Sequence, residues 1–295
     1  MHRRHFARLA AGAAAPVFAA APFRVIDPHV HVWKRDPRYP WALGAPKLPD
    51  RDATPEMLLE LMRANGVART VIVQVIYYKW DNRYLADVLK QYPGSFQGVA
   101  RVDPEDPAAP DHLSKLVQQQ GFRGVRLSPA ATPAGDWIRG PLMPPLWRRC
   151  RDLRVPMTIL APVARMPDVA PLAERFPDLT LVIDHMADSP LDQPAELEKL
   201  LALRRYPKLF VKISHTWSLS RQRYPYPDSQ VQVKRLYDAF GPRRLMWGTD
   251  WPLVENHCGY ARALALVRDE MKFLSGEDKG WILGRTVERV WPFTV

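Results

Sequence analysis

Short apolar runs alternate with longer amphipathic segments along the chain from residue 23 onward. Eight of the short runs predict strands. Several of them are almost entirely valine, isoleucine and leucine, which is typical of parallel strands that are buried on both faces. The predicted strands lie at 23–26, 70–75, 96–102, 124–127, 156–160, 179–183, 209–213 and 244–247.

The longer segments between these runs predict helices. The first begins at Thr54, whose side chain is a good N-cap, continues with Pro55 and Glu56 in its first turn, and ends before Gly66. Further helices are predicted at 81–91, 109–120, 144–153, 166–176, 193–206, 228–240 and 259–274. Each predicted strand is therefore followed by a predicted helix.

Eight strand-then-helix units predict a single (β/α)8 TIM barrel that occupies residues 22–295. A doubly wound open sheet is the alternative, and it would place a glycine-rich phosphate loop after the first strand. The sequence has Pro28-His29-Val30-His31 at that place, which favours the barrel. The connection 32–53 is rich in tryptophan, tyrosine and proline, and we expect it to form an ordered loop over the barrel mouth.

The first 21 residues have a different character. Arg3 and Arg4 precede an alanine-rich apolar run that is too short to span a membrane and ends in small residues. This layout is typical of a bacterial export signal, and the paired arginines resemble the twin-arginine type. We expect residues 1–21 to address the chain to the twin-arginine export machinery and the rest to be periplasmic or secreted. The alternative is a disordered basic tail on a cytoplasmic protein.

Composition narrows the class of partner. The chain has 295 residues, of which 47% are hydrophobic and 25% charged, as in ordinary globular proteins. The net charge is +11, but lysines and arginines are spread among acids, with no basic block and no nucleic-acid-binding motif. We therefore expect a small anionic substrate, no nucleic acid and no membrane span. Cys150 and Cys258 form no metal motif, and are either buried thiols or a disulfide.

Histidines gather at the predicted carboxyl ends of the strands, where barrel enzymes carry their active sites. His29 and His31 stand two residues apart after the first strand, and side chains at this spacing in an extended segment point to the same side, as a metal ion requires. His185 and His215 follow the sixth and seventh strands, and Asp250 follows the eighth. Any one of these histidines could be structural, but their coincidence on one rim favours an active site.

Three further residues bear on the predicted site. Arg126 lies in the fourth strand and is expected to bind a substrate carboxylate through its planar guanidinium, with a salt bridge inside the barrel rim as the alternative. His112 lies in a predicted helix and is expected at the surface. His257 lies in the loop after the eighth strand, and its place is left open.

With these residues, the chain resembles the amidohydrolase-related family of (β/α)8 metal-dependent hydrolases, over residues 23–295. One further segment, after the first strand, is similar to the branch of sugar-acid lactonases, sulfomuconolactone hydrolase and pyrone-dicarboxylate hydrolase. The matching residues are Asp27-x-His29-x-His31, His185, Trp247-Gly248-Thr249-Asp250-Trp251-Pro252 and, for the branch, Tyr39-Pro40-Trp41.

The chain also departs from binuclear members of the wider superfamily. These members carry a carboxylated lysine in the fourth strand and a histidine at the fifth, where this chain has Arg126 and Leu160-Ala161. The resemblance therefore implies one metal ion at most. His215 stands where many relatives of the branch have a small residue, and it is open whether it contacts substrate, carries a proton or neighbours the metal.

The resemblance implies a hydrolase that opens a lactone or related cyclic ester. Asp250 is expected to be the general base on water, with His185 beside it in the catalytic set, while Arg126 and His215 bind the substrate. One divalent ion, expected to be Zn²⁺, would polarise the carbonyl or acidify the water, although relatives without a metal leave metal-independent operation open. The expected metal ligands are His29, His31, His185 and Asp250.

Two other functions are weighed against lactone hydrolysis. A metal-dependent non-oxidative decarboxylase of the same family would use the same ligands to hold an acid. A secreted binding protein that kept the barrel and lost turnover is the third possibility, and the intact set of His29, His31, His185 and Asp250 argues against it.

Overall fold

A computed structural model describes residues 23–127 and 140–293 of the chain. Its strands are all parallel and form one sheet in the order β1-β2-β3 and another in the order β4-β5-β6-β7-β8. The strands are β1 (Val25–Val30), β2 (Val67–Val73), β3 (Phe96–Val99), β4 (Val125–Leu127), β5 (Met157–Ile159), β6 (Leu181–Ile183), β7 (Leu209–Lys212) and β8 (Leu245–Met246).

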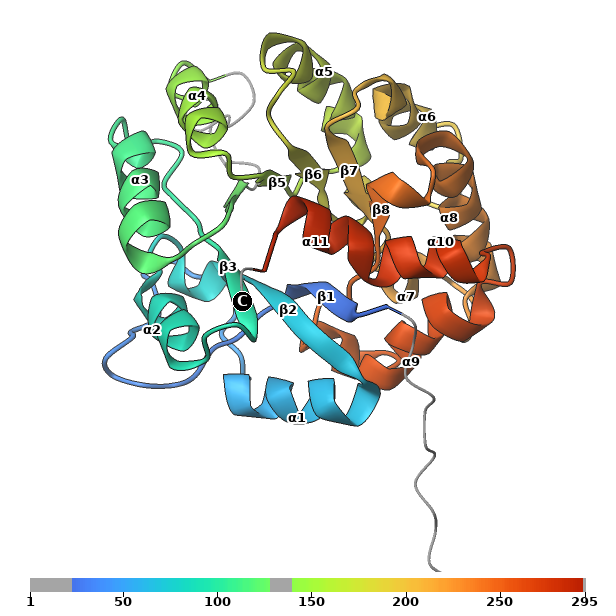
Figure 1. Cartoon of the computed structure of the whole chain (residues 1–295), viewed down its shortest axis with the longest axis horizontal. Coiled ribbons are helices and arrows are strands. Elements are labelled where there is room, and N and C mark those ends of the chain that lie inside the picture. Colours follow the sequence, from blue (N-terminus) through green and yellow to red (C-terminus); the bar gives the residue numbers. More distant parts are fainter. Residues whose placement is uncertain (1–22, 128–139, 294–295) are drawn as a thin grey trace, which may run out of the picture.

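Two bridges join these sheets into a closed ring. Ala100, which follows β3, pairs with Val125 in β4, and Val30 at the end of β1 pairs with Trp251 beyond β8. The amide of His31 donates a hydrogen bond of 2.7 Å to the carbonyl of Trp251 across the second junction. Figure 1 shows the strands surrounded by helices, so the predicted (β/α)8 barrel is confirmed.

The helices follow the predicted order with local differences. Thr54 caps α1 through a hydrogen bond from the Met57 amide, and Gly66 ends it in a left-handed conformation, as expected. The predicted helix at 193–206 is shorter, because α6 continues as a 3-10 turn at Ala202–Arg205. The helices are α1 (Pro55–Asn65), α2 (Arg83–Gln91), α3 (Ala109–Gln120), α4 (Met143–Leu153), α5 (Met166–Arg175), α6 (Leu197–Leu201), α7 (Thr216–Leu219), α8 (Pro227–Phe240), α9 (Tyr260–Ala265), α10 (Gly276–Gly280) and α11 (Thr286–Val290).

The interior of the barrel contains an apolar cluster, and α11 packs against it (Figure 1). Inward-facing side chains of the strands pack against three residues at the end of the chain, and all of them are buried. The strand residues are Ile26, Val71, Val73, Val99, Val182, Phe210 and Met246, and the closing residues are Val287, Val290 and Trp291. The polar side chains of the candidate site lie outside this apolar cluster.

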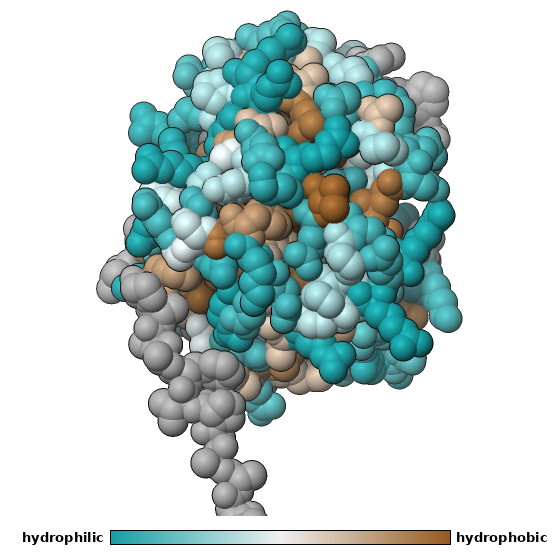
Figure 2. Space-filling model, turned by 90° about the vertical axis from the view of Figure 1, so that its right-hand side faces the viewer, coloured by the Kyte–Doolittle hydropathy of each residue, from teal (hydrophilic) through white to brown (hydrophobic). Residues whose placement is uncertain are grey.

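Several expectations from the sequence concern other parts of the chain. The predicted export signal at 1–21 lies outside the described residues and stays a prediction. Cys150 is a buried free thiol and Cys258 a partly buried one, so no disulfide joins them. Among the helices that the structure describes, none has the length and apolarity to cross a membrane. The face shown in Figure 2 is mainly hydrophilic, with apolar side chains exposed in small groups.

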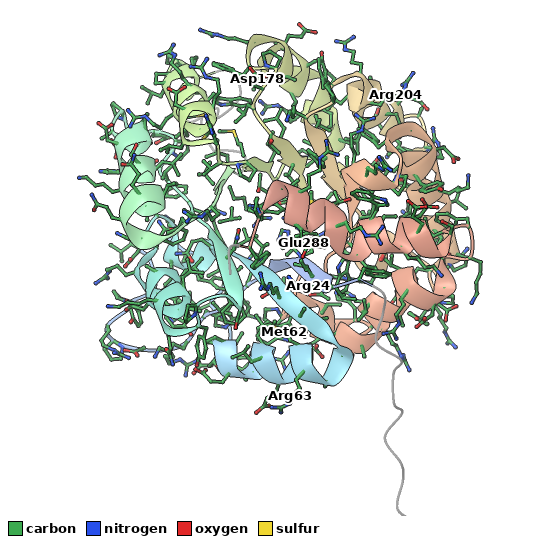
Figure 3. All side chains as sticks on the ribbon, viewed as in Figure 1. Arg24, Met62, Arg63, Asp178, Arg204 and Glu288 are labelled. Carbon is green, nitrogen blue, oxygen red and sulfur yellow. The ribbon has the colours of Figure 1, made fainter. Side chains whose placement is uncertain are left out.

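The carboxyl-terminal helices lie directly on the start of β1. Gly284 packs so closely there that a Cβ atom on it would overlap the carbonyl oxygen of Arg24. One turn further on, Glu288 forms an ion pair of 3.7 Å with Arg24, and both labels stand together at the centre of Figure 3. The first strand and the last helix of the barrel are thus held together by backbone contact.

We expect Gly284→Ala to lower the free energy of unfolding by about 3 kcal/mol or more, because the methyl group meets backbone rather than a side chain that can move. Gly276→Ala is the matched control, since a Cβ there has no neighbour within 4 Å. Urea denaturation of both variants measures the difference. Equal stability of the two would show that the contact between Gly284 and β1 is not tight in solution.

Candidate active site

The histidine motif of β1 is part of the strand, which runs on to Val30 instead of ending at residue 26 as predicted. Its pairing with β2 is irregular between Asp27 and Val30. The buried carboxylate of Asp27 accepts hydrogen bonds from the His29 amide (3.1 Å) and from the hydroxyl of Thr249 (2.5 Å), which follows β8. Asp27 therefore anchors the motif to the turn that carries Asp250.

His29, His31 and Asp250 converge on one point. The Oδ1 atom of Asp250 lies 3.2 Å from Nε2 of His31 and 3.6 Å from Nε2 of His29. The Nδ1 atom of His31 lies 2.6 Å from the carbonyl oxygen of Val73, so it donates a hydrogen there. In the neutral ring, this leaves the lone pair of Nε2 facing the carboxylate, and two acceptors in that position repel each other unless a cation lies between them.

These donor atoms fit a divalent metal ion. Within the described residues, Nε2 of His29 and Oδ1 of Asp250 are buried and have no hydrogen-bond partner. Ligand atoms about 2.0–2.2 Å from a tetrahedral ion lie about 3.3–3.6 Å apart, which is close to the separations here. Burial, and then the positive charge of Lys212, lower the pKa of His29 to about 3, so its ring is neutral as a ligand must be.

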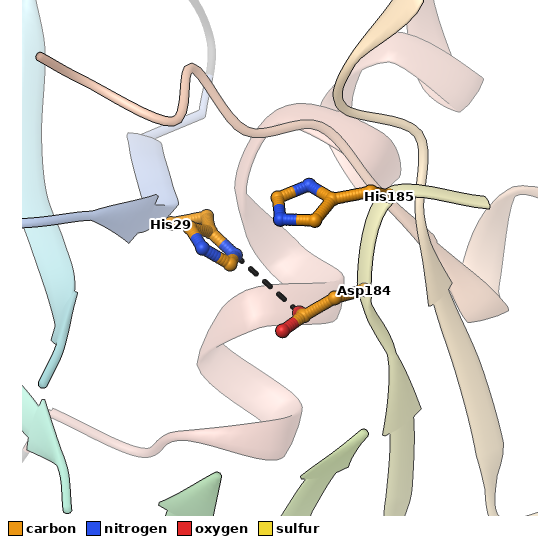
Figure 4. Close-up of side chains that lie close together, drawn as sticks. All are labelled: His29, Asp184 and His185. Atoms are coloured by element: carbon orange, nitrogen blue, oxygen red, sulfur yellow. Dashed lines mark ion pairs between the residues drawn. The ribbon is translucent and has the colours of Figure 1, made fainter. Parts of the chain in front are cut away.

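His185 and His215 lie beside this cluster, as the sequence predicted. His185 follows β6 in a left-handed conformation, with Nδ1 2.8 Å from Oγ of Ser214. Its ring stacks on that of His215 with centroids 3.5 Å apart. The ring centroid of His29 lies 4.5 Å from that of His185, and Figure 4 shows these two rings beside each other. His185 groups with His29 and Asp184 as one set of potential metal ligands, and with His215 and Asp250 as another.

His215 connects two carboxylates. Its Nε2 lies 2.7 Å from Oδ2 of Asp250, and its Nδ1 lies 3.0 Å from Oδ1 of Asp188. Burial opposes protonation, but these two hydrogen bonds outweigh it and raise the pKa of His215 to about 9. The His215 cation and its neighbouring histidines hold the pKa of Asp250 well below its usual range despite burial. Asp250 is therefore ionised at neutral pH.

Two charged residues that contact His29 were not predicted from the sequence. Asp184, directly before His185, is fully buried, with its Oδ1 atom 3.0 Å from Nζ of Lys212 and 3.3 Å from Nδ1 of His29 (Figure 4). Lys212 is also fully buried and lies 3.1 Å from that Nδ1. A hydrogen on Nδ1 of His29 would face the carboxylate of Asp184, and this tautomer leaves Nε2 as a metal ligand. The signal in the sequence was Lys212 itself, because a lysine in an otherwise apolar buried strand requires a buried partner of opposite charge.

Arg126 is the fourth member of this buried group. Its Nε atom donates a hydrogen bond of 2.9 Å to Oδ2 of Asp184, so the salt bridge that the sequence left as the alternative is present. Whether its guanidinium also binds a substrate carboxylate stays a prediction. The group holds two side-chain cations, Arg126 and Lys212, around one carboxylate.

The other two histidines of the described residues, His112 and His257, lie outside this cluster. His112 is exposed and forms an ion pair of 3.2 Å with Asp106, as expected of a surface residue. His257 stacks on Trp217 at 4.2 Å, and Trp217 in turn lies 5.0 Å from the ring of His215. His257 thus supports the wall behind His215.

Comparisons with known proteins show the family to which the chain is similar. The sequence profile of a family described as Amidohydrolase matches residues 26–293. The chain is 31% identical over 240 residues to an L-fucono-1,5-lactonase of Burkholderia ambifaria, which covers 77% of the chain and 80% of that protein. It is 29% identical to a 4-sulfomuconolactone hydrolase of Hydrogenophaga intermedia, covering 79% and 75%. A crystal structure of a zinc-bound amidohydrolase from Burkholderia multivorans superposes with a TM-score of 0.77 at 22% identity, covering 92% of this chain and all of that one.

Metal binding can be measured without turnover. We expect zinc at one hundred times its Kd to stabilise the chelator-treated protein by about 2.7 kcal/mol, because the ion binds only the folded chain. His31→Asn should abolish this gain, whereas His112→Asn, on the surface, should keep it. Thermal unfolding and metal analysis of protein never exposed to a nickel column provide the readout. A zinc-dependent gain that survives His31→Asn would place the ion elsewhere.

Proposed function

The chain belongs to the amidohydrolase family and is a hydrolase, and we propose that it opens a lactone or related cyclic ester of an anionic small molecule. The observation that carries this proposal is the convergence of His29, His31 and Asp250 at the carboxyl ends of the barrel strands. The relatives described as a lactonase and a muconolactone hydrolase support it, since both names refer to lactone opening.

Asp250 is the proposed general base. It is ionised at neutral pH, and its position between the histidines lets it take a proton from an attacking water and return it to the leaving ring oxygen. The His215 cation also makes Asp250 a weak base, so the water must be made more acidic, which is the chemistry that a bound divalent ion would supply. We propose zinc for this ion, because imidazole nitrogens with a carboxylate oxygen are common zinc ligands.

His215 and His185 assist Asp250. His215 is held as a cation between Asp188 and Asp250, so it can keep Asp250 oriented and ionised and carry a proton between the two carboxylates. Burial, and then the charge of His215, lower the pKa of His185 well below its usual range, so His185 is neutral. Neutral His185 can ligate the metal or accept a hydrogen bond from the substrate.

A screen of lactones and cyclic esters with a pH indicator tests the proposed reaction. For a lactone that is turned over, we expect Asp250→Asn to lower kcat by about 10²–10⁴-fold, because an amide cannot take the proton from water. Asp178→Asn, at an exposed position labelled in Figure 3, is the matched control and should leave kcat unchanged.

Three results would contradict the proposal. Full activity of Asp250→Asn would remove Asp250 as the base. Release of CO2 from aromatic or enol acids, without acid release from lactones, would identify the decarboxylase. Tight binding with neither reaction would identify a binding protein.

A further inference from the structure

Arg101 is a buried arginine to which none of the proposed roles applies. It follows β3, and because Val99 packs inside the barrel, the alternation of side chains also points Arg101 inward. Its side chain and backbone together are only 2% exposed. Its Nε atom has no hydrogen-bond partner, and no carboxylate of the described residues forms an ion pair with it.

The charge that acts on the pKa of Arg101 has the same sign. Burial, and then repulsion from Arg126 on the neighbouring strand β4, lower the pKa of Arg101 to about 9, so it remains a cation at neutral pH. A buried, unpaired charge is strongly unfavourable in a folded protein. Its contact within the described residues is the ring of Trp80, whose centroid lies 5.3 Å from the guanidinium carbon. This contact compensates only a small part of the lost hydration.

The backbone of Arg101 is held firmly in spite of this cost. The side-chain oxygen of Asn82 accepts a hydrogen bond of 3.0 Å from the Arg101 amide, and its nitrogen donates one of 2.9 Å to the Arg101 carbonyl. The same nitrogen donates to the carbonyl of Trp80 at 2.9 Å. Asn82 is itself buried, so the position of Arg101 is built into the structure.

We propose that Arg101 and Arg126 together bind a carboxylate or sulfonate group of the substrate, and that Arg101 thereby selects anionic lactones over neutral ones. This inference rests on the proposed function. In the ring of eight strands, β3 and β4 lie opposite β7 and β8, so an anion held there would leave the reacting ester near Asp250. Planar guanidinium groups bind such oxyanions through paired hydrogen bonds.

The names of the relatives indicate substrates that differ in charge, which is the property that Arg101 would select. The lactonase relative is named for a sugar lactone without a charged group, whereas the muconolactone relative is named for a sulfonated lactone. Two neighbouring guanidinium groups, with Asp184 as the one carboxylate paired with either of them among the residues that the structure describes, favour the charged class for this chain.

Binding of a simple probe tests the inference without turnover. Calorimetry at constant ionic strength compares glutarate with its neutral analogue glutaramide on the full chain. We expect glutarate to bind the wild type, and Arg101→Met to weaken its Kd by about tenfold or more, since one charge-assisted hydrogen-bonding pair is lost. Arg83→Met is the matched control, because Arg83 is exposed and already paired with Asp81 at 2.6 Å.

Stability separates a binding role from a structural one. Arg101→Met should not lower Tm in the absence of ligand, because it removes an unpaired buried charge and keeps the packing against Trp80. Arg126→Met should lower Tm, because it removes a hydrogen-bonding partner of buried Asp184. For a lactone that is hydrolysed, the ratio of KM for a carboxylated substrate to KM for its amide should rise about tenfold or more in Arg101→Met.

The outcomes distinguish this inference from the proposed function. Glutarate binding that is absent in the wild type, or unchanged in Arg101→Met, would overturn the inference even if lactones are hydrolysed. A fall in Tm with equal loss of glutarate and glutaramide binding would assign Arg101 to the fold instead. Glutarate binding that depends on Arg101, in a protein that hydrolyses no lactone, would support the anion site and overturn the proposed reaction.

Discussion

The carboxylate of Asp184 joins the strands on which the site is built. It follows β6 and contacts Arg126 from β4, Lys212 from β7 and His29 from β1. A buried carboxylate is tolerated only when cations and hydrogen bonds replace its hydration. Here the positive charge of Lys212, the neighbouring ring of His29 and the positive charge of Arg126 hold the pKa of Asp184 well below the usual range against burial. The position and tautomer of His29 therefore depend on charges from three other strands.

Much of this architecture could be predicted from the sequence, because it follows from local patterns. The apolar runs identified every strand, and polar residues at strand ends identified His29, His31, His185, His215 and Asp250. Asp184 and Lys212 were missed because each looks ordinary in its own segment, and their importance arises only when distant strands become neighbours. The partner of Arg126 was undecided for the same reason. The helix α11 was missed because its five residues are too few for a clear amphipathic period.

Apolar packing and the charged side chains of the site occupy different parts of the barrel. Apolar side chains fill the end that α11 closes, where Trp291 is fully buried. Charged side chains occupy the other end, and Lys212 spans the boundary, with its Nζ atom 5.3 Å from the ring of Trp291 and 3.0 Å from Asp184. The apolar end supplies the burial free energy that offsets the cost of the charged layer. This arrangement allows a cation such as Arg101, which has no carboxylate partner in the described part of the chain, to persist in a stable fold.

The contact between Gly284 and β1 has a consequence for the order in which the molecule can form. His29 and His31 are among the first residues of the barrel to be synthesised, but Asp250 comes more than two hundred residues later, and the helices that brace β1 later still. A nascent or truncated chain therefore carries half of a metal site with nothing to complete it. Contacts between residues so distant in sequence form slowly. Because the proposed ligands come from the first and last strands, they would hold an ion only after the whole barrel has formed.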